Sequence, residues 1–166
     1  MALIVFVMVA LAFLVHLAVS RNRCKKRVVE LALAYLLGGV LGLGSIAAGV
    51  FHLIDGPATA ARIGWAAGSP FQVEVGVADI ALGTICFLCI FIRGNFVLAA
   101  LIAQSIFLFG CMAGHIKNWA ESGNAAAYNI GSSIIFSDLI LPLLAIGLYL
   151  ASRYLERRGS SASFRL

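Results

Sequence analysis

Charge is scarce in this sequence. Charged residues make up 11% of the 166 residues, whereas hydrophobic residues make up 62%. A typical soluble domain carries about 25% charged residues, so this composition excludes an ordinary soluble protein and predicts a protein of the lipid bilayer. No segment is long enough to form a separate soluble domain. We therefore expect one all-α integral membrane bundle over residues 1–152, followed by a basic cytoplasmic tail over residues 153–166.

Several familiar motifs are absent as well. The four cysteines show no pattern of external pairs, which argues against a disulfide framework. The glycines of GGVLGLG follow no predicted strand, so they do not form a nucleotide-binding fingerprint. No HExxH or Glu-x-x-His pair marks a local metal site. The net charge of +5 comes from basic residues beside apolar stretches, where they orient the chain in a membrane, so we expect no binding of nucleic acid.

Apolar stretches dominate what is present. A helix that crosses the hydrocarbon core of a bilayer, about 30 Å thick, needs about 20 apolar residues. Five stretches qualify, namely residues 1–20, 28–54, 70–92, 96–116 and 132–151. The first has no basic residues before it and is too long for the apolar part of a signal peptide, so we expect a retained first span.

The basic residues predict the orientation of these spans. If the loops alternate between the two sides, ten of the twelve Lys and Arg residues fall on one side, and only Arg62 and Lys117 fall on the other. Cytoplasmic loops carry the excess of Lys and Arg. The sequence therefore predicts five spans in the cell (inner) membrane, with the amino terminus outside and the carboxyl terminus in the cytoplasm.

The connection over residues 55–69 is too polar and too rich in glycine to cross the membrane. Its first three residues, Asp-Gly-Pro, are typical of a helix start, so they predict a short helix that ends near Gly64. With Trp65 behind it, we expect this helix to lie in the headgroup layer. Ser69 is expected to cap the third span, and the side chain of Gln72 to return to that cap.

Small and polar residues at spacings of three and four predict the faces on which the spans meet. The stripes are Gly38, Gly42, Ser45, Gly49 and His52 in the second span; Gly76, Asp79, Gly83 and Cys86 in the third; and Gln104, Leu108, Cys111 and His115 in the fourth. In the fifth span Asp138 precedes Pro142 by four residues, and we expect a kink there. Glu74 lies about 140° around the helix from Asp79 and need not share its face.

With this orientation, six ionisable residues fall in the outer half of the bundle: His52, Asp55, Glu74, Asp79, His115 and Asp138. An ionisable residue inside a span is costly and usually faces protein or water, which makes it a candidate functional residue. Purely structural roles compete, since imidazoles favour helix C-termini, Glu favours N-termini and Asp55 can cap a helix. We assign His52, Glu74, His115 and Asp138 as ligand or metal candidates, supported by Asp55, Gln72 and Asp79.

Mixed imidazole and carboxylate donors suit zinc, iron or manganese, and two imidazoles from different helices suit haem b. One function is therefore a metal or small-ligand pocket, and if the protein is an enzyme it performs metal-assisted chemistry on a lipophilic or extracytoplasmic small molecule. A proton- or ion-coupled transporter is an alternative, although the polar residues deeper in the bundle are few: Thr84, Gln104 and Ser105. Another is an accessory or scaffold subunit that contacts a membrane partner or a second copy.

The segments FHLIDGPATAARIGWAAGSPFQVEVGVADIALG, AGHIKNW and SDLILP resemble a family of small prokaryotic multi-span membrane proteins known only as a domain of unknown function. The resemblance covers roughly residues 35 to 150, and its most specific parts are IGW, SPFQ-x-E-x-G, GHI and the Asp before the proline of the last span. It implies no activity. The motif positions it implies are His52, Trp65, Ser69, Pro70, Phe71, Gln72, Glu74, Gly76, Gly114, His115, Asp138 and Pro142. Position 79, more often Asn-like in such proteins, is Asp in this chain.

Overall fold

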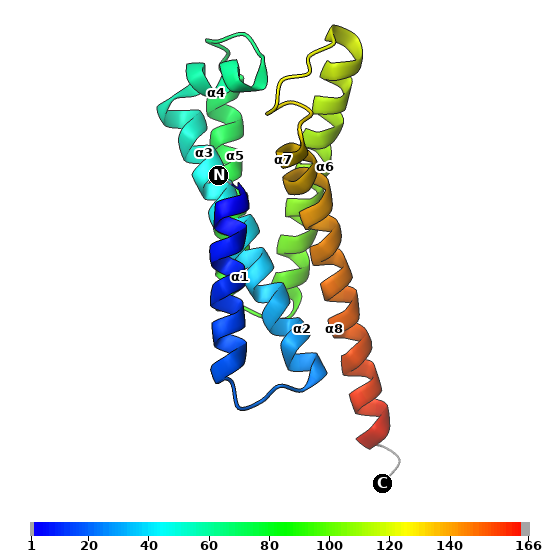
Figure 1. The fold of residues 1–166 in the computed structure, drawn as a ribbon. Coiled ribbons are helices and arrows are strands. Elements are labelled where there is room, and N and C mark those ends of the chain that lie inside the picture. The colour runs from blue at the N-terminus through cyan, green and yellow to red at the C-terminus, as the bar shows by residue number, and fades with distance from the viewer. Residues whose placement is uncertain (1, 164–166) are drawn as a thin grey trace.

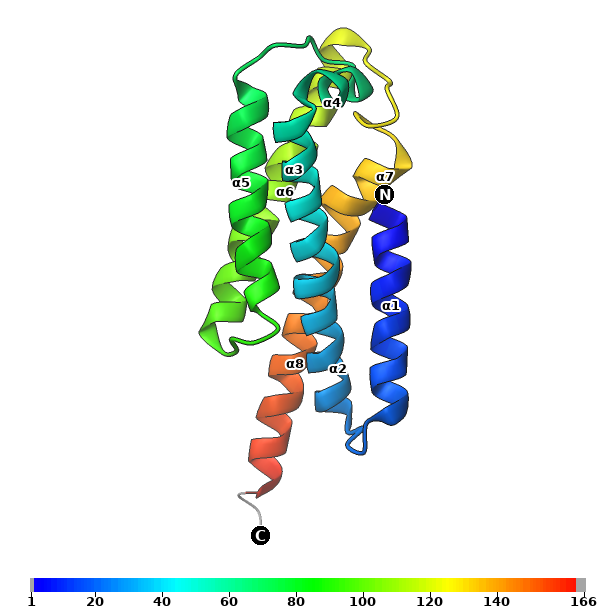
Figure 2. The same cartoon turned by 90° about the vertical axis from the view of Figure 1, so that its left-hand side faces the viewer.

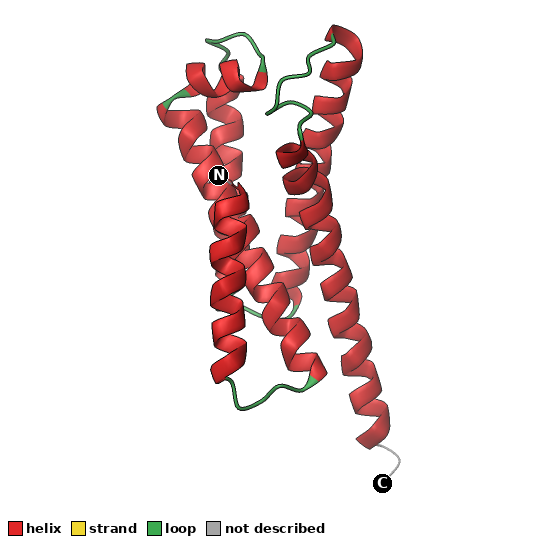
Figure 3. Cartoon of the chain, viewed as in Figure 1, coloured by secondary structure: helices red, strands yellow, loops and turns green. Residues whose placement is uncertain are grey.

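All regular elements of the computed structural model, which describes residues 2–163, are helices (Figure 3). In chain order they are α1 (Ala2–Val19), α2 (Lys25–Ala34), η1 (Tyr35–Gly42), α3 (Leu43–Ile54), α4 (Gly56–Ile63), α5 (Phe71–Leu88), α6 (Asn95–Ser122), α7 (Ser132–Ile135), η2 (Phe136–Ile140) and α8 (Leu141–Ser163). The two η elements are π-helical. Because no gap separates them from their neighbours, α2, η1 and α3 form one long helix, and α7, η2 and α8 form another.

The long helices run up and down along a common axis (Figures 1 and 2). One end carries α4 and the loop over residues 123–131, and we call it the α4 end. The opposite end carries the α1–α2 connection, the α5–α6 connection and the carboxyl-terminal end of α8, and we call it the basic end (Figure 1). Successive connections between the long helices therefore lie at alternate ends of the bundle (Figure 1).

Four helices are long and apolar enough to cross a membrane: Lys25–Ile54, Phe71–Leu88, Asn95–Ser122 and Ser132–Gly159. The described apolar part of α1, Ile4–Val19, is shorter. The all-helical architecture is confirmed, and four of the five predicted spans meet the requirements of length and composition. The fold is that of a helical membrane protein.

Glycines bring η1 and α3 into close contact with α5. A Cβ atom added to Gly49 would lie 2.4 Å from the carbonyl oxygen of Gly76, and one added to Gly83 would lie 2.7 Å from the carbonyl oxygen of Gly42. Real Cβ atoms essentially never approach so closely. The small-residue stripes of the second and third spans therefore pack against each other, as helices in lipid do when small side chains let backbones approach.

Pro142 follows directly after a widened turn. The backbone N–H of Leu141 donates to the carbonyl oxygen of Phe136, five residues earlier, which is the π-helical pattern. Proline has no N–H to continue an α-helical ladder, and the π turn lies where the missing donor disturbs that ladder. The sequence placed the irregularity correctly, and Asp138 lies inside it with a buried side chain.

The connection between α3 and α5 confirms one local prediction and corrects another. Asp55 caps α4, since its Oδ1 accepts from the N–H of Ala58 at 3.3 Å, and Gly64 ends the helix at φ +79°. Ser69 accepts from the N–H of Phe71 at 3.3 Å, just before α5 begins. The predicted return of Gln72 to this cap is wrong, because its side chain extends instead to another helix.

The carboxyl-terminal region also differs from expectation. The sequence predicted a basic tail from residue 153 onward, separate from the bundle, but α8 continues without a break through Ser163, and residues 164–166 lie outside the described part of the chain. Glu156 contributes to this order, because it contacts Arg153 within α8 and Lys26 of α2. Part of the predicted basic tail is therefore a helical extension at the basic end.

The apolar core fills the middle of the bundle and its basic half. It contains side chains from α2, η1, α5, α6 and α8, among them Leu37, Cys86 and Cys89, which are fully buried. The three cysteines Cys86, Cys89 and Cys111 are free thiols. The apolar core lies away from the α4 end. Buried polar side chains, among them Gln72, His115 and Asn129, lie in the interior at that end.

Candidate functional site

His52 joins α3 to α5 through Gln72. The imidazole Nδ1 lies 2.6 Å from Oε1 of Gln72, and Gln72 is buried whereas His52 is partly buried. An amide oxygen can only accept, so Nδ1 donates and carries the ring proton. This hydrogen bond occupies Nδ1 and leaves Nε2 outside it; in the neutral ring Nε2 carries the lone pair.

His115 of α6 is held in the same way. Its Nδ1 donates to Oδ1 of Asn129 at 2.9 Å, and its ring stacks on that of Trp65 with centroids 5.6 Å apart and an angle of 21° between the planes. His115 is buried. The stacking and the hydrogen bond fix the orientation of the ring and leave Nε2 outside this hydrogen bond. An amide or carboxylate that orients imidazole in this manner is common beside ligand and metal sites.

Three asparagines, which sequence analysis did not select, tie the two loops of the α4 end together. Asn118 accepts at Oδ1 from Trp65 Nε1 at 3.2 Å and from Asn124 Nδ2 at 2.7 Å. Asn124 also donates to the carbonyl oxygen of Ile63 at 2.9 Å. Asn129 is fully buried and donates to the carbonyl oxygen of Asn124 at 2.8 Å. The available signal was the recurrence of Asn from the end of α6 through the 123–131 loop, among residues that are mainly small.

Glycine is needed at position 64 for two separate reasons. Its φ of +79° lies in the left-handed region that favours glycine, and an added Cβ atom would lie 2.6 Å from Oδ1 of Asn124. Gly68, with φ +86°, has no atom within 4 Å of such a Cβ. Gly64 therefore serves both the turn after α4 and the approach of the 123–131 loop, whereas Gly68 serves only a turn.

Two acids approach each other beneath these loops. Asp79 of α5 and Asp138 of η2 are 7% and 8% exposed, and they lie near enough to repel each other when both are ionised. Asp138 accepts from Ser137 Oγ at 2.6 Å and interacts electrostatically with His115. Cys111 interacts with both acids. Within the described residues, Asp79 has neither a side-chain hydrogen bond nor an ion pair.

The position of Asp79 is energetically unfavourable for an ionised carboxyl group. Two carboxylates in a low-dielectric interior repel each other, and burying a carboxylate without a compensating donor or cation is costly. Inside a membrane bundle such residues face the protein interior and mark ligand or ion sites. We call the side chains of Asp79, Cys111, His115 and Asp138 the acid cluster.

The structure places the remaining predicted site residues elsewhere. Glu74 is exposed and lies off the buried face of α5, which carries Gln72, Gly76 and Asp79. Asp55 is exposed and caps α4. His52 forms a hydrogen bond with Gln72, and among the described residues no hydrogen bond or ion pair joins it to the acid cluster. Of the four ligand candidates, the structure thus brings together His115 and Asp138, and Asp79 joins them.

The acid cluster does not form a ready set of metal ligands. Among the described residues, no group of three or more His, Cys, Asp or Glu side chains is arranged to hold a metal ion. Binding of zinc, iron or manganese, and the alternative of haem b, stay predictions. The donors present are two carboxylates, one thiol and one oriented imidazole, and carboxylates attract any small cation.

A second polar link lies deeper in the bundle. Gln104 of α6 donates from Nε2 to Ser45 Oγ at 2.9 Å, and Cys86 donates from Sγ to Gln104 Oε1 at 3.6 Å. This link connects α3, α5 and α6. Cys86 lies two helical turns from Asp79 on the same buried face of α5. Polar groups therefore continue from the acid cluster toward the basic end.

Four membrane-length helices around a buried polar cluster define the class: a multi-span helical membrane protein. The comparison with protein families specifies this further. Residues 1–158 match a family of unknown function, DUF6790, and the chain belongs to that family. This confirms the resemblance to a domain of unknown function. No curated protein and no solved structure matches the chain.

Proposed function

We propose that this membrane protein binds a small cation at the acid cluster, with Asp79 and Asp138 as the groups that receive its charge. The observation that supports this most strongly is Asp79, whose largely buried side chain has no hydrogen bond or ion pair among the described residues and lies near a second buried acid. A bound cation offsets both the repulsion between the acids and the loss of their hydration.

The surrounding groups suit such a ligand. The imidazole of His115, fixed through Asn129 and Trp65, offers Nε2 as an acceptor for an N–H group or as a donor to a metal. The ligand class is therefore a small organic ammonium compound or a metal cation. A metal-assisted reaction would follow only for the second. Trp65 and the 123–131 loop cover the α4 end of the bundle, so we expect the cation to enter from that end.

A thermal stability assay tests this proposal. Purified protein in detergent is unfolded in the presence of Na⁺, ethylammonium or Zn²⁺, one at a time, and compared with Asp79→Asn. At a hundred times its dissociation constant, a ligand that binds only the folded state stabilises it by about 2.7 kcal/mol. We expect one of these cations to raise the unfolding midpoint of the wild type by several degrees, and to raise that of Asp79→Asn much less.

Glu74→Gln provides the matched control, because Glu74 is an acid of the same helix but is exposed. This variant should respond to the cation as the wild type does. Bound metal in the purified protein, measured by elemental analysis, separates a metal cation from an ammonium compound. An equal response of the wild type and Asp79→Asn, or no response of the wild type to any of the three, contradicts the proposal and favours an accessory or scaffold role.

We infer that α1 is a fifth span in the cell membrane. α1 lies beside η1 and runs antiparallel to it (Figures 1 and 2), and its outer face carries exposed apolar residues such as Ile4, Met8 and Leu11. Its 18 residues extend about 27 Å at 1.5 Å per residue, close to the thickness of the hydrocarbon core. Ion pairs and basic residues gather at the basic end, which supports a cytoplasmic location for that end.

Labelling of membrane vesicles checks this topology. Cys24 is exposed in the α1–α2 connection, whereas Cys86 and Cys89 are buried. A membrane-impermeant maleimide should label Cys24 in inverted vesicles and not in right-side-out vesicles. An epitope tag before the first residue, and a cysteine placed by Glu121→Cys in a Cys24→Ser background, should both be reached from the opposite side. A tag on the same side as Cys24 contradicts the fifth span.

Cation-coupled transport is a second candidate. The link from Cys86 through Gln104 to Ser45 favours it, because this link continues the polar groups of α5 beyond the acid cluster. Transport requires the cation to cross the membrane, whereas binding does not. Uptake of the stabilising cation into proteoliposomes, lost in Asp79→Asn, distinguishes the two functions.

A further inference from the structure

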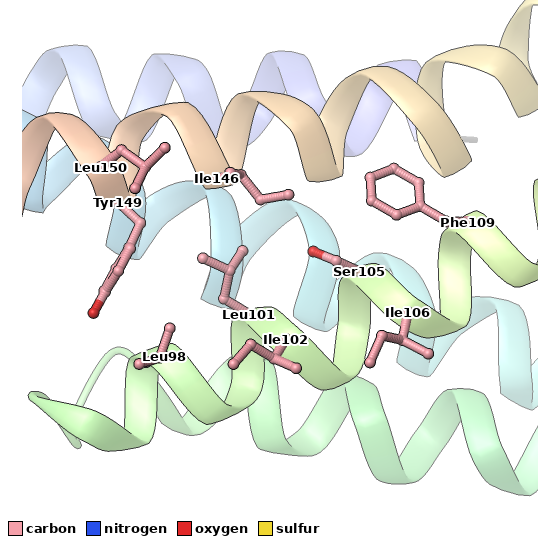
Figure 4. Close-up of a pocket in the computed structure, with 9 residues that line it drawn as sticks. All are labelled: Leu98, Leu101, Ile102, Ser105, Ile106, Phe109, Ile146, Tyr149 and Leu150. Carbon is pink, nitrogen blue, oxygen red and sulfur yellow. The ribbon is translucent and has the colours of Figure 1, made fainter.

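An apolar groove lies between α6 and α8 (Figure 4). Its volume is about 340 Å³. On α6 the lining extends from Leu98 to Phe109, which is about 17 Å at 1.5 Å per residue. Sites for small molecules have volumes of about 300–1,000 Å³. The groove is thus large enough for a small molecule and too small to enclose a helix, which is 10–12 Å wide.

Ser105 provides the one unpartnered polar atom here. It is 6% exposed, and among the described residues its Oγ is the only fully enclosed side-chain nitrogen or oxygen without a hydrogen-bond partner. Figure 4 shows the hydroxyl pointing from α6 toward α8, next to Ile146. A buried hydroxyl without a partner is unfavourable, so this orientation calls for an oxygen that comes from outside the described chain.

We propose that the groove binds a lipid-soluble molecule with an apolar body and a carbonyl oxygen, which accepts the hydrogen bond of Ser105. The depth of Ser105 selects this chemistry. Ser105 lies near the middle of the apolar stretch 96–116, so the ester groups of phospholipids, at the edge of a hydrocarbon core about 30 Å thick, are too far away. A plain acyl chain has no acceptor. The ligand reaches the enclosed oxygen by displacing the partly buried side chain of Ile146.

Two probes that differ in one oxygen test this proposal. 9-Fluorenone is a rigid aromatic ketone, and fluorene is the corresponding hydrocarbon. Each is titrated against the full-length protein in lipid nanodiscs, with empty nanodiscs as the baseline. We expect fluorenone to bind the wild type about fivefold more tightly than fluorene, the effect of one net hydrogen bond. In Ser105→Ala the two probes should bind equally, and Ser105→Thr should retain the preference.

A substitution that fills the groove with a larger side chain provides the second test. Ile102 lines the groove and is 51% exposed, so Ile102→Trp should remove saturable binding of both probes. Val77, which is 55% exposed on α5 outside the groove, gives the matched control, and Val77→Trp should bind as the wild type does. An equal preference for fluorenone in the wild type and Ser105→Ala overturns the proposal. An absence of saturable binding of both probes to the wild type also overturns it. The same holds if Ile102→Trp changes only the number of protein chains in each nanodisc and leaves probe binding intact.

Discussion

Gly49→Ala is expected to destabilise the folded bundle by about 1–3 kcal/mol, the usual cost of overpacking a tight contact. The new methyl group would lie 2.4 Å from the carbonyl oxygen of Gly76 and 2.8 Å from the side chain of Ile80. A backbone atom cannot rotate away, so α3 and α5 have to separate along their whole contact. Gly49→Leu should therefore abolish the folded state. The unfolding midpoint in detergent, read by circular dichroism, measures both effects.

Gly44→Ala is the control for this prediction. Gly44 lies in the same helix, and an added Cβ atom has no neighbour within 4 Å. The substitution removes the conformational freedom of glycine in the unfolded chain, so it should be neutral or stabilise the fold by up to about 1 kcal/mol. Equal destabilisation by Gly44→Ala and Gly49→Ala would show that the cost is a general loss of glycine and not the contact with α5.

Asn129→Ala is expected to have the second large effect. Its side chain is fully buried and bonds to His115 Nδ1, and it donates to the carbonyl oxygen of Asn124. Removal leaves the buried donor of His115 unpaired, at a cost of about 1–3 kcal/mol, and also the partly buried carbonyl oxygen of Asn124. The imidazole then loses its fixed orientation, and Trp65 loses its stacking partner. A lower unfolding midpoint and easier quenching of tryptophan fluorescence by iodide measure this change.

Asn95→Ala is the matched control for Asn129. Asn95 is exposed at the start of α6 and has no side-chain hydrogen bond. Its removal should change the midpoint by less than about 0.5 kcal/mol, as surface substitutions generally do. If Asn129→Ala behaves like Asn95→Ala in both measurements, the loop does not hold His115 in the way described.

The helices and their contact faces could be predicted because their signals are local. Apolar length gave the spans, and the spacing of Gly42, Gly49, Gly76 and Gly83 gave the two faces that meet. The start of α4 at Asp55 followed from side-chain chemistry within a few residues. The proline of the last span marked the irregular turn that contains Asp138, since a missing N–H disturbs the ladder wherever the helix packs.

The candidate site was predictable only in part, because its geometry depends on pairs of distant segments. Periodicity placed Asp79 inward and showed that Glu74 need not share its face, yet it could not show that His52 and Gln72 pair with each other instead of with the acids. The role of Asn129 depends on a loop whose path no helix rule describes. The helical residues beyond 152 were missed because their polar composition resembles that of a disordered tail, whereas Glu156 anchors them to α2.

A double-mutant cycle on the two buried acids tests the central claim most directly. The dissociation constants of Na⁺, ethylammonium and Zn²⁺ are measured for the wild type, Asp79→Asn, Asp138→Asn and the double variant. If both acids hold one cation, each single substitution weakens the binding of that cation at least about tenfold, and the double substitution weakens it by less than the product of the two, since the groups share a partner. Independent, multiplicative effects, or unchanged binding in either single variant, would contradict a shared cation site.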